Sequence, residues 1–348
     1  LLLRVLDRKD DFMEYSDIVI SLVRKYGLYP YLKNFDLSLS DEIACEIHKP
    51  EGLKNIVFHS KQNEIYYTLI HKGNVVLSAP TSFGKSLIID SIITSNLYNN
   101  IMIIVPSIAL IDETRKRLIK YNEQYRVISF SGQSLGNRNI FVLTQERALD
   151  YIDRANIDFF VIDEFYKLDI KENQDENDSR EIILNQVFYK LFKSQANYYL
   201  LGPNIERLIA PKLNEQKYQF IKTDYKTVVS EFHQIKNNAL NKEAKLLELC
   251  EGIAGQTLIY CQSPASANKV AELLFGNLDL ERIDNNDDFV HWIRQNYHPD
   301  WKYPTYLEYG IGVHHGKIPR ALAQRSVEMF NRGLLKFLIC TSTLIEGV

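Results

Sequence analysis

The stretch that decides the fold reads Asn74-Val-Val-Leu-Ser-Ala-Pro-Thr-Ser-Phe-Gly-Lys-Ser-Leu-Ile-Ile-Asp90. The β-branched run at its start predicts a buried strand, and the apolar residues that follow Gly84 predict a helix. Small and polar residues between the two predict a tight turn. In such a unit, backbone N–H groups of the turn and of the helix start converge on a phosphate. The stretch therefore predicts a phosphate-binding loop (P-loop) in an α/β protein.

The loop also has the residue types that bind a nucleoside triphosphate. A small residue, four positions of any kind and then Gly-Lys-Ser match the P-loop spacing. We expect Lys85 to contact the β- and γ-phosphates of ATP, and the Ser86 hydroxyl to bind Mg²⁺. The other residues expected against ATP are Thr81, Ser82, Phe83 and Gly84. Because only Gly84 has the backbone freedom of glycine, the Phe83 ring has to point away from the phosphates.

A second motif makes this interpretation specific. The apolar run Phe159–Ile162 predicts a strand, which ends at Asp163 and Glu164. We expect it to be a neighbouring strand of the same sheet, where Asp163 would hold Mg²⁺ and Glu164 would orient and deprotonate the attacking water. Two acidic residues at a strand end are often only solvated, but beside a P-loop the catalytic interpretation is favoured.

Composition bounds the class of protein. The 348 residues are 45% hydrophobic and 24% charged, with a net charge of −3, which is typical of a soluble globular protein. Without a global basic field, any nucleic-acid site has to be a local groove. No apolar run of about 18 residues predicts a membrane span, and no signal peptide is evident. The cysteines have no metal-type spacing and are expected to be buried thiols of a cytoplasmic protein: Cys45, Cys250, Cys261 and Cys340.

Polar residues follow several of the predicted strands. Pro106-Ser107, Ser131-Gly132 and Thr144-Gln145 each come after an apolar run. In an open α/β sheet, ligands bind at the carboxyl ends of the strands. We therefore expect these six residues to contact the phosphates of a nucleic-acid strand. The basic residues from Arg115 to Lys120 are interpreted as the solvated face of a helix.

A second α/β unit begins near residue 243. The pair His314-His315 follows a short strand, and neighbouring strand residues point to opposite faces, so a shared metal ion is excluded. A phosphate or domain-interface contact is the functional alternative. The aromatic region Asp284–Tyr306 is expected to pack as an insertion, with base stacking as the alternative.

Gln62, which precedes the P-loop, either reads the adenine edge of ATP through paired hydrogen bonds or lies on a helix surface.

Taken in order, the motifs resemble those of superfamily 2 DEAD/DEAH-box helicases, most closely the Ski2-like branch. Gln62 sits like the Q motif, and residues 79–86, 106–110, 144–147, 163–166, 201–204, 258–261 and 341–347 are similar to motifs I, Ia, Ic, II, III, IV and V. His314-His315-Gly316 with Arg320 resembles the His-His element of that branch. The match covers roughly residues 55–348.

The resemblance implies an α/β fold with two RecA-like doubly wound parallel sheets. Residues 1–50 would form an N-terminal helical accessory segment, 51–228 the ATP-binding RecA-like domain 1, and 229–348 a C-terminally truncated RecA-like domain 2. A single strand would cross both, with His315, Arg320 and Thr341 contacting it on the second domain. It implies ATP-driven movement, 3′ to 5′, on single-stranded or partly duplex nucleic acid, with DNA favoured over RNA.

Residues 27–32, together with the P-loop and the last motif, are also similar to bacterial antiphage-defence helicases of the Hachiman type. Such helicases have a nuclease subunit as partner.

Two motifs depart from the family pattern: Tyr166 replaces His or Asp, and Gly202-Pro203-Asn204 replaces Ser-Ala-Thr. The link between hydrolysis and strand movement is therefore expected to differ.

Two further functions compete with the motor. One is an ATP-gated switch that senses DNA or RNA ends without processive unwinding, and the other is a P-loop kinase of a small molecule. Glu164 favours the motor over the switch, and the second α/β unit disfavours the kinase. Because the chain ends before the arginine motif of the family, we expect this chain to bind ATP but to hydrolyse it poorly.

Overall fold

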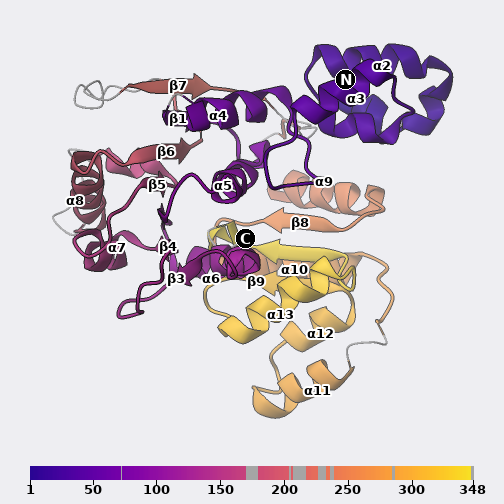
Figure 1. Cartoon of the computed structure of the whole chain (residues 1–348). Coiled ribbons are helices and arrows are strands. Elements are labelled where there is room, and N and C mark those ends of the chain that lie inside the picture. Colours follow the sequence, from indigo (N-terminus) through magenta and orange to yellow (C-terminus); the bar gives the residue numbers. More distant parts are fainter. Residues whose placement is uncertain are drawn as a thin grey trace. The chain divides into compact units, whose positions relative to one another are not determined.

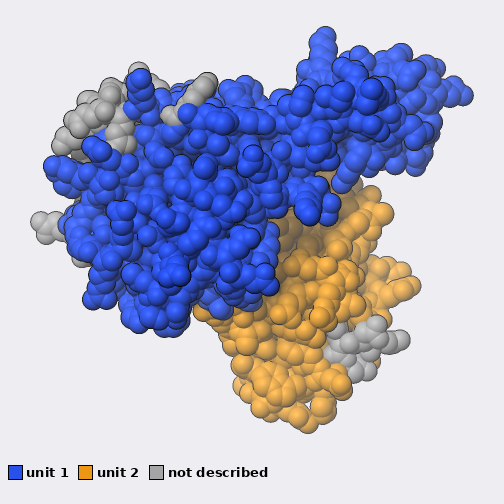
Figure 2. Space-filling view, viewed as in Figure 1, with its two compact units in different colours: residues 1–231 blue, residues 232–348 orange. Residues whose placement is uncertain are grey.

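The computed structural model describes residues 1–71, 73–169, 179–203, 205–206, 217–225, 233–235, 239–283 and 287–345. The chain forms two compact units, residues 1–231 and 232–348 (Figure 2). The domain boundary expected between residues 228 and 229 lies outside the described residues, as do Asn204 and the end of the last motif, 346–348. Within these ranges, none of the helices combines the length and the apolar character needed to cross a lipid bilayer.

The first unit is built on a seven-stranded parallel sheet (Figure 1). Its strands are β1 (Asn74–Ser78), β2 (Asn100–Ile104), β3 (Arg126–Ile128), β4 (Asn139–Leu143), β5 (Phe159–Ile162), β6 (Asn197–Gly202) and β7 (Tyr218–Lys222), in the order β3-β4-β2-β5-β6-β1-β7. The strand that ends at Asp163 is therefore in the sheet of the P-loop, as expected. It is not the neighbour of β1, however, because β6 pairs with both.

Helices cover both faces of this sheet. On one face lie α4 (Ser60–His71), α5 (Lys85–Thr94) and α6 (Ile108–Leu118), and on the other α7 (Gln145–Ile152) and α8 (Ser179–Lys193) (Figure 1). Successive strand residues point to opposite faces, so Val75 joins the core under α5 whereas Val76 joins the core under α7 and α8. A sheet buried on both faces explains the continuous apolar runs that the sequence shows.

Short helices precede the sheet: α1 (Leu2–Asp7), η1 (Lys9–Tyr15), α2 (Ser16–Lys25), η2 (Tyr29–Asn34) and α3 (Leu39–Ile47). They enclose a small core of their own, centred on Val23 and Leu32. Short 3₁₀ turns follow further elements of the unit: η3 (Thr81–Phe83), η4 (Ile119–Tyr121) and η5 (Phe165–Leu168).

The second unit has a three-stranded parallel sheet in the order β8-β10-β9. Its elements are α9 (Ala239–Gly252), β8 (Thr257–Tyr260), α10 (Pro264–Asn277), α11 (Asp287–Asn296), α12 (Tyr303–Glu308), β9 (Ile311–His314), α13 (Arg320–Asn331), β10 (Phe337–Cys340) and α14 (Ser342–Ile345). The expected class is thereby confirmed: an α/β protein with two parallel sheets, consistent with RecA-like domains, and an N-terminal helical segment. The edge strand β7 was not anticipated, because only Ile221 of its residues is fully buried.

Candidate functional site

The P-loop connects β1 to α5 through a residue with left-handed backbone. Gly84 has φ 80° and ψ 35° and directly precedes the first turn of α5. A Cβ at this position would lie 2.5 Å from the Nε2 atom of Gln62. Both the backbone angles and the close approach require glycine here.

Gln62 lies against this loop. Its Nε2 donates to the carbonyl of Phe83 (2.9 Å), and its Oε1 accepts from the backbone N–H of His59 (3.2 Å). The N–H of Gln62 in turn donates to Nδ1 of His59 (3.3 Å), which completes a reciprocal cap at the start of α4. Gln62 is 5% exposed, so the helix-surface alternative is wrong. The contact of Gln62 with the adenine edge stays a prediction. In this structure both ends of the Gln62 amide bond to the protein itself.

The Phe83 side chain is buried in the apolar core, as expected from the single glycine of the loop. Its ring packs edge-on against the His59 ring, with centroids 4.9 Å apart. Thr81 and Ser82 precede it in η3. The loop therefore turns its apolar side chain into the core of the unit.

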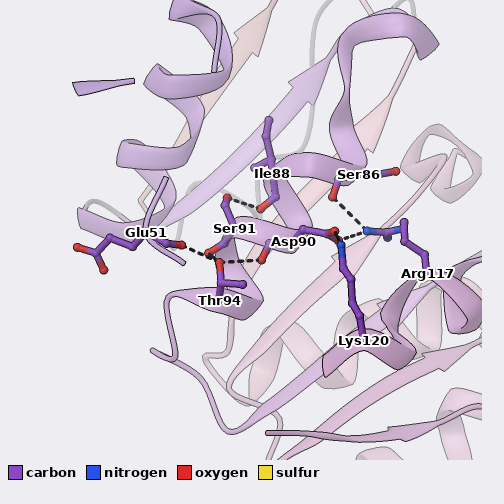
Figure 3. Close-up of polar contacts among 8 residues, drawn as sticks. All are labelled: Glu51, Ser86, Ile88, Asp90, Ser91, Thr94, Arg117 and Lys120. Carbon is purple, nitrogen blue, oxygen red and sulfur yellow. Dashed lines mark hydrogen bonds and ion pairs between the residues drawn. The ribbon is translucent and has the colours of Figure 1, made fainter. Parts of the chain in front are cut away.

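Two basic residues of α6 and η4 reach the P-loop helix (Figure 3). Arg117 forms an ion pair with Asp90 and donates to the backbone carbonyl of Ser86 (3.3 Å), while Lys120 pairs with the other oxygen of Asp90 (2.8 Å). The expectation of a wholly solvated basic face is therefore wrong for Arg117. The reason is Asp90, a buried carboxylate one helix away that requires a charged partner.

The Lys85 ammonium and the acidic pair after β5 influence each other. Burial lowers the pKa of Lys85, whereas Asp163 and Glu164 raise it. Burial likewise raises the pKa of Asp163, and the Lys85 charge lowers it. These opposite charges thus interact across the carboxyl edge of the sheet, although β6 separates their strands.

Glu164 adopts an uncommon backbone conformation. Its φ of 56° and ψ of 42° are left-handed, which L-residues other than Asn and Asp rarely adopt. Its carboxylate pairs with Lys167 at 2.5 Å, and its N–H donates to the Asp163 carboxylate at 3.0 Å. Non-glycine residues with such angles cluster at functional sites.

A cavity of about 180 Å³ adjoins Asp163. Pro106 and Gln145, two of the expected nucleic-acid residues, line it together with Arg180. Arg180 donates to the carbonyl of Pro106 (2.9 Å) and pairs with Glu146 (2.7 Å). Arg180 could not be predicted from the sequence, because it lies far along the chain from both partners.

The remaining residues of the first unit that are expected to contact nucleic acid follow strands β2, β3 and β4. Ser107 caps α6 by accepting from the N–H of Leu110 (3.3 Å), and Thr144 is buried at the start of α7. Ser131 is exposed and donates to Asp150 (2.5 Å), and Gly132 has a left-handed φ of 85°. Since all strands are parallel, these residues share the carboxyl edge of the sheet with Lys85 and Asp163.

The second unit places His315 after β9 and Thr341 after β10, at the carboxyl edge of its own sheet. His315 is buried, and its Nε2 contacts the Oδ1 of Asn268 (3.2 Å); burial lowers its pKa. Arg320 is exposed at the first turn of α13. The N–H of Thr341 donates to the carbonyl of His314 (3.1 Å), which ties the two strand ends together.

The segments that hold the two departures from the family pattern lie side by side, but the contact is made by a residue other than Tyr166. The ring of Phe165, not of Tyr166, lies beside Gly202, where a Cβ would be 3.4 Å from it and 2.7 Å from Ile205. Tyr166 is 42% exposed. Gly202 is therefore needed for close packing of the segment after β6 against η5.

The residues fit ATP with Mg²⁺. The Ser86 hydroxyl and the Asp163 carboxylate are hard oxygen donors of the kind that Mg²⁺ prefers. The left-handed backbone at Gly84 leads directly into the first turn of α5, whose N–H groups are of the kind that bind phosphate. Lys85 supplies a cation at the same edge.

Comparison with known families agrees with this geometry. Residues 59–196 match the DEAD/DEAH box helicase family. The chain contains a DEAD/DEAH box helicase domain. Residues 1–42, which hold the N-terminal helices, match the anti-bacteriophage protein B N-terminal domain. The predicted resemblance to these helicases is confirmed.

Three curated relatives are similar to the chain. Anti-bacteriophage protein B of Escherichia coli (strain K12) is 38% identical over 363 residues, which is 100% of this chain and 49% of that protein. The DExH-box ATP-dependent RNA helicases DExH12 and DExH14 of Arabidopsis thaliana are 24% and 22% identical, over 82% and 96% of this chain but only 15% and 18% of their own lengths. The chain thus spans about half or less of the curated relatives that it matches.

Proposed function

We propose that the chain is the motor of an ATP-dependent nucleic-acid helicase or translocase that acts in antiviral defence. The observation that carries the proposal is that a glycine-dependent loop with Lys85 follows β1 and Asp163 follows β5 at the carboxyl edge of one parallel sheet. The effect of each charge on the pKa of the other agrees with this arrangement. The similarity to an anti-bacteriophage protein supports the defence role. Movement 3′ to 5′ on a single strand, preference for DNA and a nuclease subunit as partner belong to the proposal through the family resemblance.

In this mechanism, Lys85 and the N–H groups at the start of α5 bind the triphosphate of ATP. Ser86 and Asp163 would hold Mg²⁺, which would neutralise phosphate charge when bound. Glu164 orients the attacking water and accepts its proton, after the Lys167 ammonium has left the Glu164 carboxylate. Pro106, Ser107, Thr144 and Gln145, which follow β2 and β4, contact the nucleic-acid backbone. Nucleic acid and ATP therefore bind along the same edge of the sheet, at the ends of different strands.

The test is the ATPase rate of the full-length protein with single-stranded DNA, with single-stranded RNA and with neither. We expect nucleic acid to raise the rate. Lys85→Ala should abolish ATP binding, whereas Glu164→Gln should keep it and lower turnover by about 10²-fold or more. A Glu164→Gln protein that hydrolyses ATP at the unmodified rate with nucleic acid present shows that Glu164 is not the base. Turnover that nucleic acid does not change favours the ATP-gated switch instead.

A further inference from the structure

The second unit contains a cavity of about 860 Å³. Its walls come from α10, from the segment that joins α11 to α12, and from the loop after β9 (these helices are labelled in Figure 1). This volume is in the upper part of the range of ligand pockets, roughly 300–1,000 Å³. The cavity is therefore large enough for a nucleotide.

Aromatic rings form one side of this cavity. Tyr297, Trp301, Tyr303 and Tyr306 all line it. The Trp301 and Tyr303 rings are stacked, with centroids 4.7 Å apart and planes at 16°, and the Tyr297 ring lies 5.3 Å from Trp301. Tyr303 is held in place by a hydrogen bond to Ser326 (2.6 Å). Rings fixed in this way offer flat surfaces on which a nucleobase stacks.

Three lysine side chains also line this cavity. Lys269, Lys302 and Lys317 line it and are all exposed. Lys269 pairs with Glu243 (2.7 Å) and Lys302 with Glu272, while the part of the chain that the structure describes gives Lys317 no ion pair. Exposed ion pairs of this kind contribute little to stability, so a phosphate can replace the carboxylates.

Hydrogen-bonding groups complete the lining. The carboxylates of Glu272 and Asp300 can accept from the amino groups of a base. His315 and Asn268, bonded to each other, also line the cavity and adjoin the carboxyl end of β9. The cavity thus opens next to the strand end where the second unit is expected to contact nucleic acid.

We propose that this cavity holds one nucleotide of a single strand, with the base against Trp301 and a neighbouring phosphate against Lys302 and Lys317. The proposal rests on the proposed function in one respect, namely that the chain binds a single strand. It assigns to the aromatic segment a base-stacking role, whereas the sequence had favoured packing of an insertion. The two roles are compatible, because Tyr303 is buried in the domain while Trp301 is only partly buried.

Tryptophan fluorescence tests the proposal, because the chain has only Trp292 and Trp301. The 348-residue chain is titrated with a twelve-nucleotide oligo(dT), with oligo(U) of that length, with an abasic backbone of that length and with free dTMP. We expect the oligonucleotides to quench the emission in the unmodified chain and in Trp292→Phe, but not in Trp301→Phe. The abasic backbone should quench in none of them, since it has no base to stack.

Affinity is measured in parallel by the fluorescence anisotropy of labelled oligo(dT). Trp301→Ala should weaken binding about fivefold to a hundredfold. Lys302→Ala and Lys317→Ala should each flatten the dependence of log affinity on log salt by about 0.7. Lys242→Ala, an exposed lysine of α9 outside the cavity, is the matched control and should change neither quantity.

The outcomes separate this proposal from the proposed function. Binding of oligo(dT) without quenching, and with unchanged affinity in the Trp301 and lysine variants, overturns the cavity proposal and leaves the motor intact. A chain that binds no oligonucleotide overturns both. If dTMP quenches at the same concentration as the oligonucleotides, the occupant is a free nucleotide and the assignment to a strand is wrong.

Discussion

The guanidinium of Arg117 in α6 pairs with the buried carboxylate of Asp90 in α5 and at the same time donates to the backbone carbonyl of Ser86 (Figure 3). Helix α5 starts at the proposed ATP site, and α6 is capped by Ser107, a proposed contact of the nucleic-acid strand. The ion pair therefore joins the two helices close to the residue expected to bind Mg²⁺. Arg117 acts as a positioning residue for Ser86, because it holds the backbone of the first turn of α5.

Arg117→Ala is expected to lower stability and to raise the KM for ATP with Mg²⁺. It leaves Asp90 with Lys120 alone and frees the Ser86 carbonyl, and losing hydrogen bonds to a charged group costs about 1.5–3 kcal/mol. Arg117→Lys keeps the positive charge but not the planar guanidinium. Its stability and its KM for ATP should therefore lie between those of the unmodified chain and of Arg117→Ala. Urea unfolding and steady-state ATPase rates measure these effects. Lys116→Ala, an exposed residue of the same helix, is the control, and equal effects of Lys116→Ala and Arg117→Ala would contradict the assignment.

Gln62→Glu is expected to disturb the P-loop. Glutamate keeps the acceptor for the His59 N–H but has no N–H for the Phe83 carbonyl, which it would face with a negative charge. An unpaired buried group costs about 1–3 kcal/mol. Calorimetric titration with ATP should show weaker binding, and thermal unfolding a lower midpoint. Lys61→Gln, on the exposed side of the same helix turn, should leave both unchanged; the proposed contact is wrong if the two variants behave alike.

Much of the architecture could be predicted because it depends on local pattern. Apolar runs separated by turn residues predict buried parallel strands, and parallel strands bring their carboxyl ends to one edge. For this reason Lys85, Asp163 and Gln145 could be assigned to one edge from sequence alone, and the structure places them there. The same rule cannot give strand order, so the position of β6 between β1 and β5 came only from the structure.

The predictions that failed concern side chains whose partners are distant in sequence. Arg117 belongs to a run of basic residues that is indistinguishable from a solvated face until Asp90 is known to be buried opposite it. For Gln62 only the helix-surface alternative is wrong, because its partner Phe83 lies in another element; the contact with adenine stays a prediction. Charge and polarity are local properties, whereas the cost of burial depends on the packing of the whole fold.

The His59 side chain predicts a fall in stability at acid pH. Burial lowers its pKa from 6.5 to about 4. Between these values the unfolded chain binds a proton that the folded chain does not, so the free energy of unfolding decreases as the pH falls. From pH 7 to pH 5 this contribution amounts to about 2 kcal/mol. Urea unfolding at the two pH values measures it.

His59→Asn isolates this effect, since asparagine also caps a helix but does not titrate. The pKa values of His314 and His315 are lowered by burial too, but both residues are present in the two proteins, so their contribution cancels in the comparison. The variant should lose about 2 kcal/mol less than the unmodified chain over this pH range. Parallel losses in both proteins would mean that His59 is not the titrating group.

The left-handed backbone of Glu164 predicts an unusual order of stability among variants that lack its carboxylate. A left-handed conformation costs an L-residue about 1–2 kcal/mol and costs glycine little. Glu164→Gly should therefore be more stable than Glu164→Ala by about 1 kcal/mol, although both should lose turnover. Asp169, exposed and with extended backbone angles of φ −78° and ψ 109°, provides the matched control. There the order should reverse, because glycine only adds freedom to the unfolded chain. Equal free energies of unfolding for the two Glu164 variants in urea would show that the left-handed backbone at position 164 does not lower the stability of the protein.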